Sequence, residues 1–154
     1  MGRINNITKT MSKFNFIFNG IGVDATATFK GNTNTAFGDG MMHPKFYVYL
    51  KTSSDRTRFT FHGSYYDYKN GVQELNEKEM LEAIDCFFSD ALAYDNARSF
   101  EDFCEEFGYT EISQYKQAKK AYDGCKRSHD AAIRLFGDYY YEALDEVREQ
   151  MENL

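Results

Sequence analysis

Residues 115–136 carry the sequence feature that most constrains the fold. Buried-type side chains recur there at alternating steps of three and four residues, at Tyr115, Ala118, Tyr122, Cys125, His129, Ala132 and Phe136. This spacing places all of them on one stripe of an α-helix, while Lys, Arg and Asp occupy the opposite side. The sequence therefore predicts a long helix over about residues 113–136, which needs an apolar surface to lie on.

The first half of the chain contains four segments with the pattern of β-strands. In each segment, apolar side chains recur at every second position, and the positions between them are polar or tyrosine except for Ile17, which is the period of a strand with one buried face. The segments are residues 14–18, 23–30, 45–51 and 56–62. Asn19-Gly20 favours a hairpin turn between the first two. Residues 31–43, rich in Gly, Asn and Thr, are predicted to form a long loop.

The second half has helical patterns. Asn76 and Ser99 are good N-cap residues, and each is followed by acidic residues that suit the first turn of a helix. We expect one α+β domain over residues 1–154, with a four-stranded antiparallel meander packed on one face by three to four C-terminal helices. The long helix lies centrally. The expected subdivisions are frayed residues 1–12, a β-rich half over 13–62 and a helical half over 76–152.

Hydropathy and cysteine usage point to a cytoplasmic protein. No run approaches the roughly 18 apolar residues of a membrane span, and the N-terminus lacks the apolar region of a signal peptide. The chain has three cysteines, an odd number at wide spacing, which is not typical of a disulfide framework. We expect no membrane partner.

The net charge of −6 hides a division along the chain. Residues 1–70 contain nine Lys and Arg against four Asp and Glu, a net charge of +5. Residues 71–154 contain nine Lys and Arg against twenty Asp and Glu, a net charge of −11. Such asymmetry favours a partner that is selected by charge.

The motif search predicts a protein that is not an enzyme. No GxGxxG, GK[ST], GxSxG or HExxH motif occurs in the chain. Cys125 and His129 lie four residues apart on one helical face, as a nucleophile and its base would. A catalytic thiol, however, needs a partly exposed and electropositive site, and the periodicity places both residues on the buried stripe.

The same residues leave a structural zinc site open. Cys125 and His129 present ligand atoms on neighbouring helical turns, and Cys104 on the preceding helix offers a third ligand. The competing interpretation is that all three are core residues, since free cysteine is common in cores.

Two surfaces are candidates for binding a partner. The acidic residues of the last helices form one candidate, namely Glu101, Asp102, Glu105, Glu106, Glu142 and Glu146. The outer face of the sheet forms the other, with Tyr47 and Tyr49 beside Arg56 and Arg58. The acidic residues also fit a merely solvated helix face, and the Tyr and Arg residues fit a protein–protein hot spot as well as a base-stacking platform.

The segment SFEDFCEEFGY, followed by KQAKKAYDGCKR and RLFG, resembles a C-terminal pattern of small phage and prophage proteins from Gram-positive hosts. The resemblance covers about residues 99–137, and Cys104 and Cys125 match positions of the pattern. Proteins of this kind include anti-CRISPR inhibitors of the type II effector nuclease, some of which bind zinc. The resemblance thus implies an inhibitor that binds a host defence nuclease and blocks its access to nucleic acid.

Two other functions stay open. The outer sheet face suits a phage accessory protein that binds single-stranded nucleic acid, although a pI near 5.1 argues against direct binding. A small structural or virion-assembly protein is the third interpretation.

Overall fold

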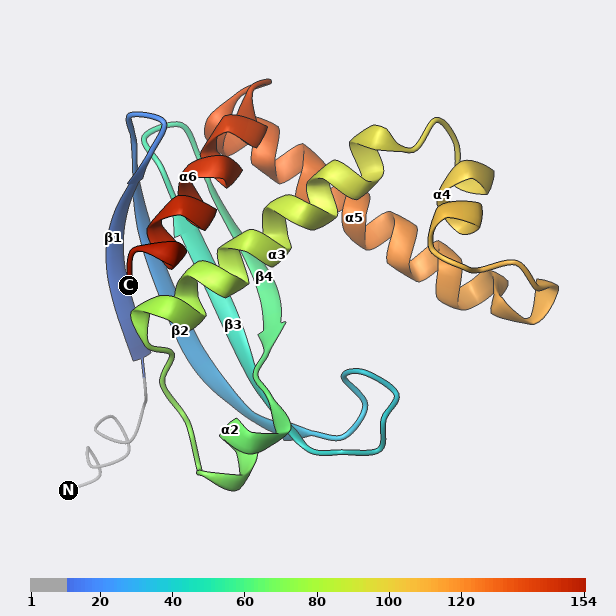
Figure 1. Ribbon diagram of the computed structural model, residues 1–154, viewed down its shortest axis with the longest axis horizontal. Coiled ribbons are helices and arrows are strands. Elements are labelled where there is room, and N and C mark those ends of the chain that lie inside the picture. The colour runs from blue at the N-terminus through green and yellow to red at the C-terminus, as the bar shows by residue number, and fades with distance from the viewer. Residues whose placement is uncertain (1–10) are drawn as a thin grey trace.

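A four-stranded antiparallel sheet forms the N-terminal part of the computed structural model, which describes residues 11–154 (Figure 1). The strands are β1 (Met11–Phe18), β2 (Ile21–Thr33), β3 (His43–Lys51) and β4 (Arg56–His62), and they lie in chain order. The predicted meander is confirmed. Asn19 and Gly20 form the first turn with φ angles of 52° and 77°, the left-handed backbone that Asn and Gly tolerate best.

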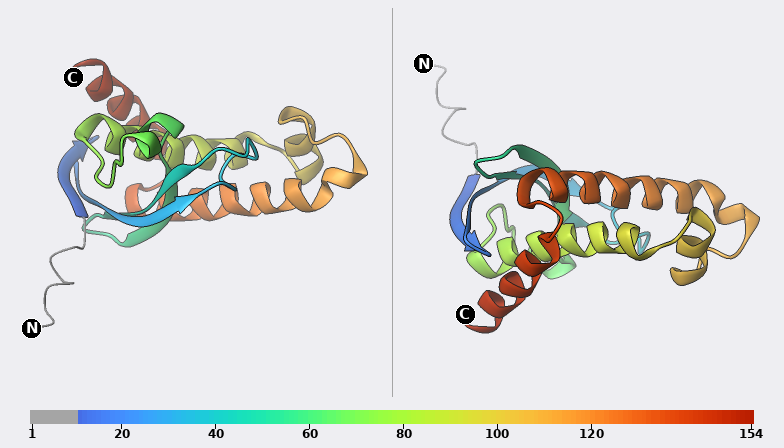
Figure 2. Two further views of the ribbon diagram at one scale, coloured as in Figure 1. Left: turned by 90° about the horizontal axis from the view of Figure 1, so that it is seen from below. Right: turned by 90° about the horizontal axis from the view of Figure 1, so that it is seen from above.

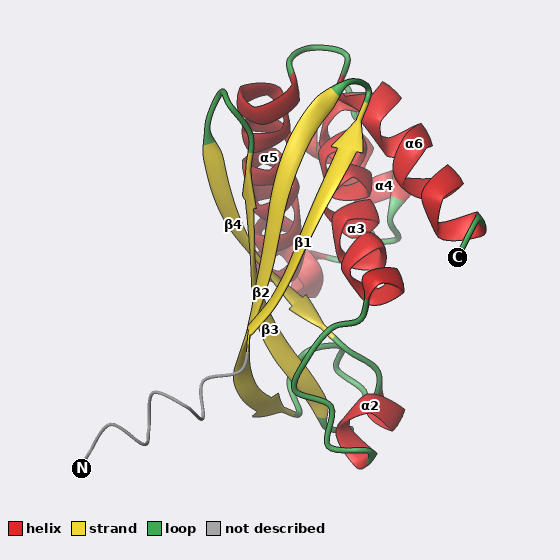
Figure 3. Ribbon diagram, turned by 90° about the vertical axis from the view of Figure 1, so that its left-hand side faces the viewer, coloured by secondary structure: helices red, strands yellow, loops and turns green. Residues whose placement is uncertain are grey.

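The inner face of the sheet is apolar because the strands are in a register that aligns their buried residues. Phe16 lies opposite Val23, Ala27 lies opposite Val48, and Val48 lies opposite Phe59. These side chains form one continuous core with the helices, in which Phe59 stacks on Phe87 with ring centroids 5.0 Å apart. The helices lie on this side of the sheet, so no described helix covers the other face, which we call the open face (Figure 3).

Five α-helices and a 3-10 turn follow the sheet. They are α2 (Tyr65–Lys69), α3 (Glu77–Asn96), α4 (Phe100–Glu106), η1 (Ile112–Gln114), α5 (Tyr115–Phe136) and α6 (Tyr140–Glu152). The long helix and the α+β fold are confirmed. Within the helical layer, α3 contacts both α5 and α6. As predicted, Asn76 caps α3 and Ser99 caps α4, each accepting a hydrogen bond from a backbone N–H three residues on.

Helices α3 and α5 lie side by side and extend beyond the sheet, and α4 covers their far ends (Figure 2). We call residues 94–125 the arm. Its interior is a cluster of aromatic rings around Tyr122, whose centroid lies 5.3 Å from Tyr94, 5.3 Å from Phe100 and 5.2 Å from Phe103. Phe103 is buried but lies outside the main core, so the arm has a small core of its own.

The long apolar stripe is therefore buried unevenly. Ala132 and Phe136 belong to the main core, whereas Tyr115 at the arm end has 58% of its surface exposed. The stripe predicts which side of the helix is apolar. It does not show that half of the helix has no sheet beneath it.

Several boundaries differ from the predictions. The expectation of frayed residues is wrong for Met11 and Ser12, because Ser12 is buried in β1 and accepts a hydrogen bond from the Leu75 N–H. Residues 1–10 lie outside the described residues. The loop prediction over 31–43 is too long, because a register shift after Phe29 lets β2 continue to Thr33. Helix α2 was not predicted.

Two glycines of α5 and its C-terminus give a matched stability test. A Cβ added at Gly124 would meet only the Arg127 guanidinium at 3.6 Å, an ordinary contact, so Gly124→Ala should raise the free energy of unfolding by about 0.5–1 kcal/mol. Gly137 ends the helix with a φ of 82°, so Gly137→Ala should lower it by about 1 kcal/mol. Urea unfolding measures both, and equal effects of the two substitutions would contradict the backbone assignment.

Candidate functional site

The open face of the sheet gathers most of the cations of the first half of the chain. Alternation and register bring six of them to this one face, namely Lys13, Lys30, Lys45, Lys51, Arg56 and Arg58. Across the strands, Lys13 lies opposite Thr26, Thr26 lies opposite Tyr49, and Tyr49 lies opposite Arg58. None of the ion pairs within residues 11–154 involves any of these six cations.

Tyr47 lies at the centre of a group of three cations. The Arg58 guanidinium carbon lies 4.4 Å from the centroid of the Tyr47 ring, and the Nζ atoms of Lys30 and Lys45 lie 5.1 Å and 5.4 Å from it. The negative face of the ring attracts each cation, yet the three cations repel one another. An anion bound beside the ring would relieve that repulsion.

Tyr49 occupies the neighbouring part of the face and is 42% exposed. An open hollow of about 1120 Å³ lies beside it, lined by Lys13, Asn15, Lys51, Arg56 and Arg58 among others. Asp24 is the carboxylate that lines this hollow. The surface therefore combines an exposed aromatic ring, hydroxyl groups and a surplus of positive charge.

The predicted pair of tyrosines and arginines is thus brought together, and the structure adds lysines that sequence reasoning missed as site residues. Lys13 lies on β1 and reaches the face of Tyr49 only through strand pairing, whereas Lys45 lies on β3 with Tyr49 and shares its face through the alternation of that strand. The period-two pattern around each of them carries the signal. For Lys45 this pattern is sufficient, whereas for Lys13 it must be combined with the strand register, which no local pattern specifies.

The predicted acidic residues of α4 lie on the arm and do not belong to the open face of the sheet. Glu101, Glu105 and Glu106 are exposed, and their side chains form no hydrogen bond or ion pair within the described residues. Asp102 has a structural role, because its carboxylate accepts a hydrogen bond from the Arg98 N–H at 3.0 Å at the start of α4.

Glu142 and Glu146 of α6 contact the β1–β2 turn. The Asn19 side-chain amide donates to Glu142 at 3.0 Å, and the Asn19 backbone N–H donates to Glu146. These two carboxylates hold the hairpin turn to α6. The structure therefore separates them from the acidic group on α4 and gives them a function within the fold.

The predicted zinc ligands do not form a compact group. His129 Nδ1 lies 3.1 Å from an Asp130 carboxylate oxygen, and its ring packs against Tyr94 at 5.1 Å. Burial raises the pKa of the Cys125 thiol to about 11, so Cys125 is protonated at neutral pH. Among residues 11–154, no three His, Cys, Asp or Glu side chains are grouped so that they could hold a metal ion. The zinc site stays a prediction.

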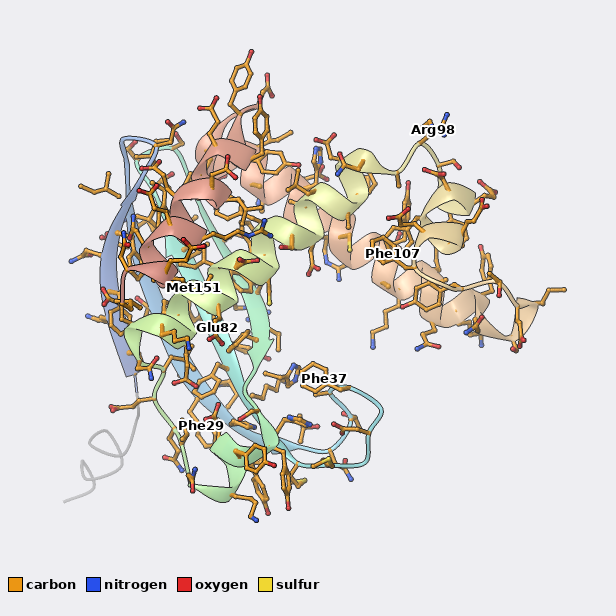
Figure 4. The ribbon with its side chains drawn as sticks, in the orientation of Figure 1. Phe29, Phe37, Glu82, Arg98, Phe107 and Met151 are labelled. Carbon is orange, nitrogen blue, oxygen red and sulfur yellow. The ribbon has the colours of Figure 1, made fainter. Side chains whose placement is uncertain are left out.

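The loop between β2 and β3 is fastened by His43. Its Nδ1 lies 2.9 Å from the Gly63 carbonyl and its Nε2 lies 2.9 Å from the Asp39 carboxylate. The ring of Phe37, which Figure 4 labels, packs on the His43 ring with centroids 4.6 Å apart. Burial lowers the pKa of His43, but the bonds to Asp39 and Gly63 outweigh burial and raise it overall. Both ring nitrogens face acceptors, so the loop has an ordered anchor.

Comparisons with protein-family models, curated proteins and solved structures found no match to this chain. No helix within residues 11–154 is long and apolar enough to cross a membrane.

Two carboxyl groups meet where α2 and α3 begin. Ser64 and Asp67 form the capping box of α2, and Asn76 and Glu79 form that of α3. Burial, and then a hydrogen bond with Asp67, raise the pKa of Glu79 from 4.5 to about 7. The folded protein thus binds this proton more tightly than the unfolded chain does.

The free energy of unfolding should therefore fall as the pH rises from about 4.5 to about 7, and the Glu79 contribution should level off above that. Glu79→Gln keeps an acceptor for the Asn76 N–H and should flatten this part of the profile, as measured by urea unfolding. Glu77→Gln, in the same helical turn, is the control and should leave the profile unchanged. A Glu79→Gln profile that parallels the parent would contradict the assignment.

Proposed function

We propose that this protein is a non-enzymatic binding module that takes single-stranded nucleic acid on the open face of its sheet. The segregation of charge supports this proposal. Within residues 11–154, six cations that form no ion pair surround two tyrosines on a face that no helix covers, while the acidic residues of α4 and α6 lie on the helical side. Anionic strands with exposed bases are the ligands that such a face suits best.

The two tyrosines contribute to binding in different ways. Tyr49 is exposed and offers its ring to a base, since every base has a π-face that can stack. Tyr47 is already surrounded by Arg58, Lys30 and Lys45, and this group provides positive charge for the phosphates. Four-stranded sheets that bind single strands stack two or three bases in this manner.

The acidic pI does not oppose this proposal. Exposed charges are screened over about 8–10 Å at physiological salt, so a strand on the sheet responds mainly to the charges of that face. The contribution of residues 71–154 to the net charge lies on the helical side of the molecule. The pI of 5.1 is an average over the whole chain, whereas a ligand on the sheet contacts only the charges of that face.

Tyr49→Ala should weaken binding of a fluorescent oligothymidylate by about 1–3 kcal/mol, or roughly 5- to 150-fold, because a stacked base loses its partner. Tyr49→Phe keeps the ring and should bind within about twofold of the parent. Fluorescence anisotropy at low salt measures the affinity of the parent and of the two variants for the oligonucleotide.

Tyr139→Ala is the matched control, since Tyr139 is 64% exposed at the start of α6. It should leave the affinity unchanged. Absence of oligothymidylate binding by the parent would overturn the proposal. Equal binding of poly-glutamate and oligothymidylate would assign the face to an acidic protein partner instead.

Inhibition of a type II CRISPR effector nuclease is the second candidate function, and the shape of the arm favours it. The arm projects from the sheet (Figure 1), and its end carries exposed Phe107, which Figure 4 labels. Exposed Ile112 follows a few residues later, and the carboxylates of α4 immediately precede Phe107 in the chain. An acidic projection with apolar residues suits a basic groove that nucleic acid would otherwise occupy.

Replacing Glu101, Glu105 and Glu106 together by Lys should abolish inhibition of DNA cleavage by a purified type II effector nuclease from a Gram-positive host. The melting temperature should stay unchanged, because none of the three side chains has a partner within the described residues. The control variant reverses Glu74, Glu149 and Glu152, which carry the same total charge elsewhere. Lack of inhibition by the parent protein excludes this candidate.

A further inference from the structure

A second hollow lies on the far side of the edge strand β4. It has a volume of about 900 Å³ and separates β4 from α5. Arg58 and Thr57 line both this cleft and the hollow on the open face. The two hollows therefore meet at β4, so a ligand on the open face needs only to pass over this edge strand to enter the cleft.

The α5 wall of the cleft carries unpaired positive charge. Lys120, Gly124 and Arg127 line the cleft on successive turns of the helix, and Lys116 lies one turn before Lys120. Lys120 and Arg127 are exposed and take part in none of the ion pairs within residues 11–154. Gly124 has no side chain, and the Arg127 guanidinium lies 3.6 Å from the place where a Cβ would be.

The β4 wall presents backbone donors. The Gly63 N–H donates to the Pro44 carbonyl, and the Thr52 N–H donates to the Asp55 carbonyl. With the register of β3 and β4, these bonds mean that the backbone N–H groups of the odd-numbered residues of β4 point toward β3. Because strand residues alternate, the backbone N–H groups of Arg58 and Thr60 face away from β3 toward the cleft. Backbone N–H groups bind phosphate oxygens as side chains do.

Two carboxylates also line the cleft. Asp130 is engaged by Lys126 at 3.2 Å and by His129 at 3.1 Å. Asp90 has no cationic partner within the described residues, and burial raises its pKa. The positive charge of Lys120, Arg127 and Arg58 exceeds this opposing charge.

We infer that a single strand bound on the open sheet face continues over β4 into the cleft, where Lys120 and Arg127 bind its phosphates. This inference rests on the proposed function and extends it, because it predicts a bound segment longer than the two or three nucleotides that a sheet alone accommodates. Strand β4 then lies beneath the middle of the ligand, with Arg58 contacting the strand on either side.

The test compares oligothymidylates of about 4 and about 12 nucleotides, lengths within the range of known single-strand sites. The variant carries Lys120→Glu and Arg127→Glu. It should bind the longer oligomer about tenfold or more weakly than the parent does, and the shorter one within about twofold. With Ala at both positions, the negative slope of log K against log salt for the longer oligomer should become shallower by about 1.4, which is about 0.7 for each lost phosphate contact.

The control variant carries Lys69→Glu and Lys78→Glu, two exposed lysines of α2 and α3 with the same charge change. It should leave the affinity for the longer oligomer within about twofold of the parent. Asp90→Asn should tighten binding of the longer oligomer only. Equal weakening of both oligomers by the Lys120 and Arg127 changes, or of neither, would overturn the extension while leaving the sheet site in place. Failure of the parent to bind either oligomer would overturn the proposed function itself.

Discussion

The packing of α3 against α5 is the interaction on which the rest of this structure depends. A helix of 22 residues, the length of α5, is about 33 Å long, whereas four strands at about 4.8 Å spacing span only about 15 Å. Each long helix therefore covers the sheet with one part and leaves the rest without support. The aromatic cluster around Tyr122 supplies that support, and α4 contributes Phe100 and Phe103 to it, so α4 covers the ends of the two long helices.

The same arrangement decides which charges a ligand meets. Helices α3, α5 and α6 use the apolar face of the sheet, so its polar face remains open to solvent. The cations of the strands gather there because residues two apart point to the same side. The part of α5 that faces β4 then places a second row of cations across a cleft from this strand. The separation of charge thus follows from the packing of the helices on one face of the sheet, and the cleft lies where α5 faces the edge strand.

Much of the secondary structure could be predicted, because its causes are local. Asn76 and Ser99 begin helices through hydrogen bonds to backbone groups three residues away, and Asn19-Gly20 turns the chain through its own backbone preferences. Helix α2 was missed because it has only five residues and no buried side chain of its own. The candidate site was predicted in part: Tyr47, Tyr49, Arg56 and Arg58 share a face through the period of two neighbouring strands, whereas Lys13 joins them only through the pairing of β1 with β2.

The sequence by itself determined the type of each main element and which side of it is apolar, because hydrogen bonding and side-chain period act within a few residues. The tertiary structure alone decided what lies beneath each apolar stripe. It placed Ala132 in the main core and left Tyr115 exposed, although both belong to one stripe. It also brought Glu142 and Glu146 into hydrogen-bonding contact with Asn19, which lies more than 120 residues away in the chain. Such contacts depend on strand register and on where two helices cross, and neither is encoded in any short segment.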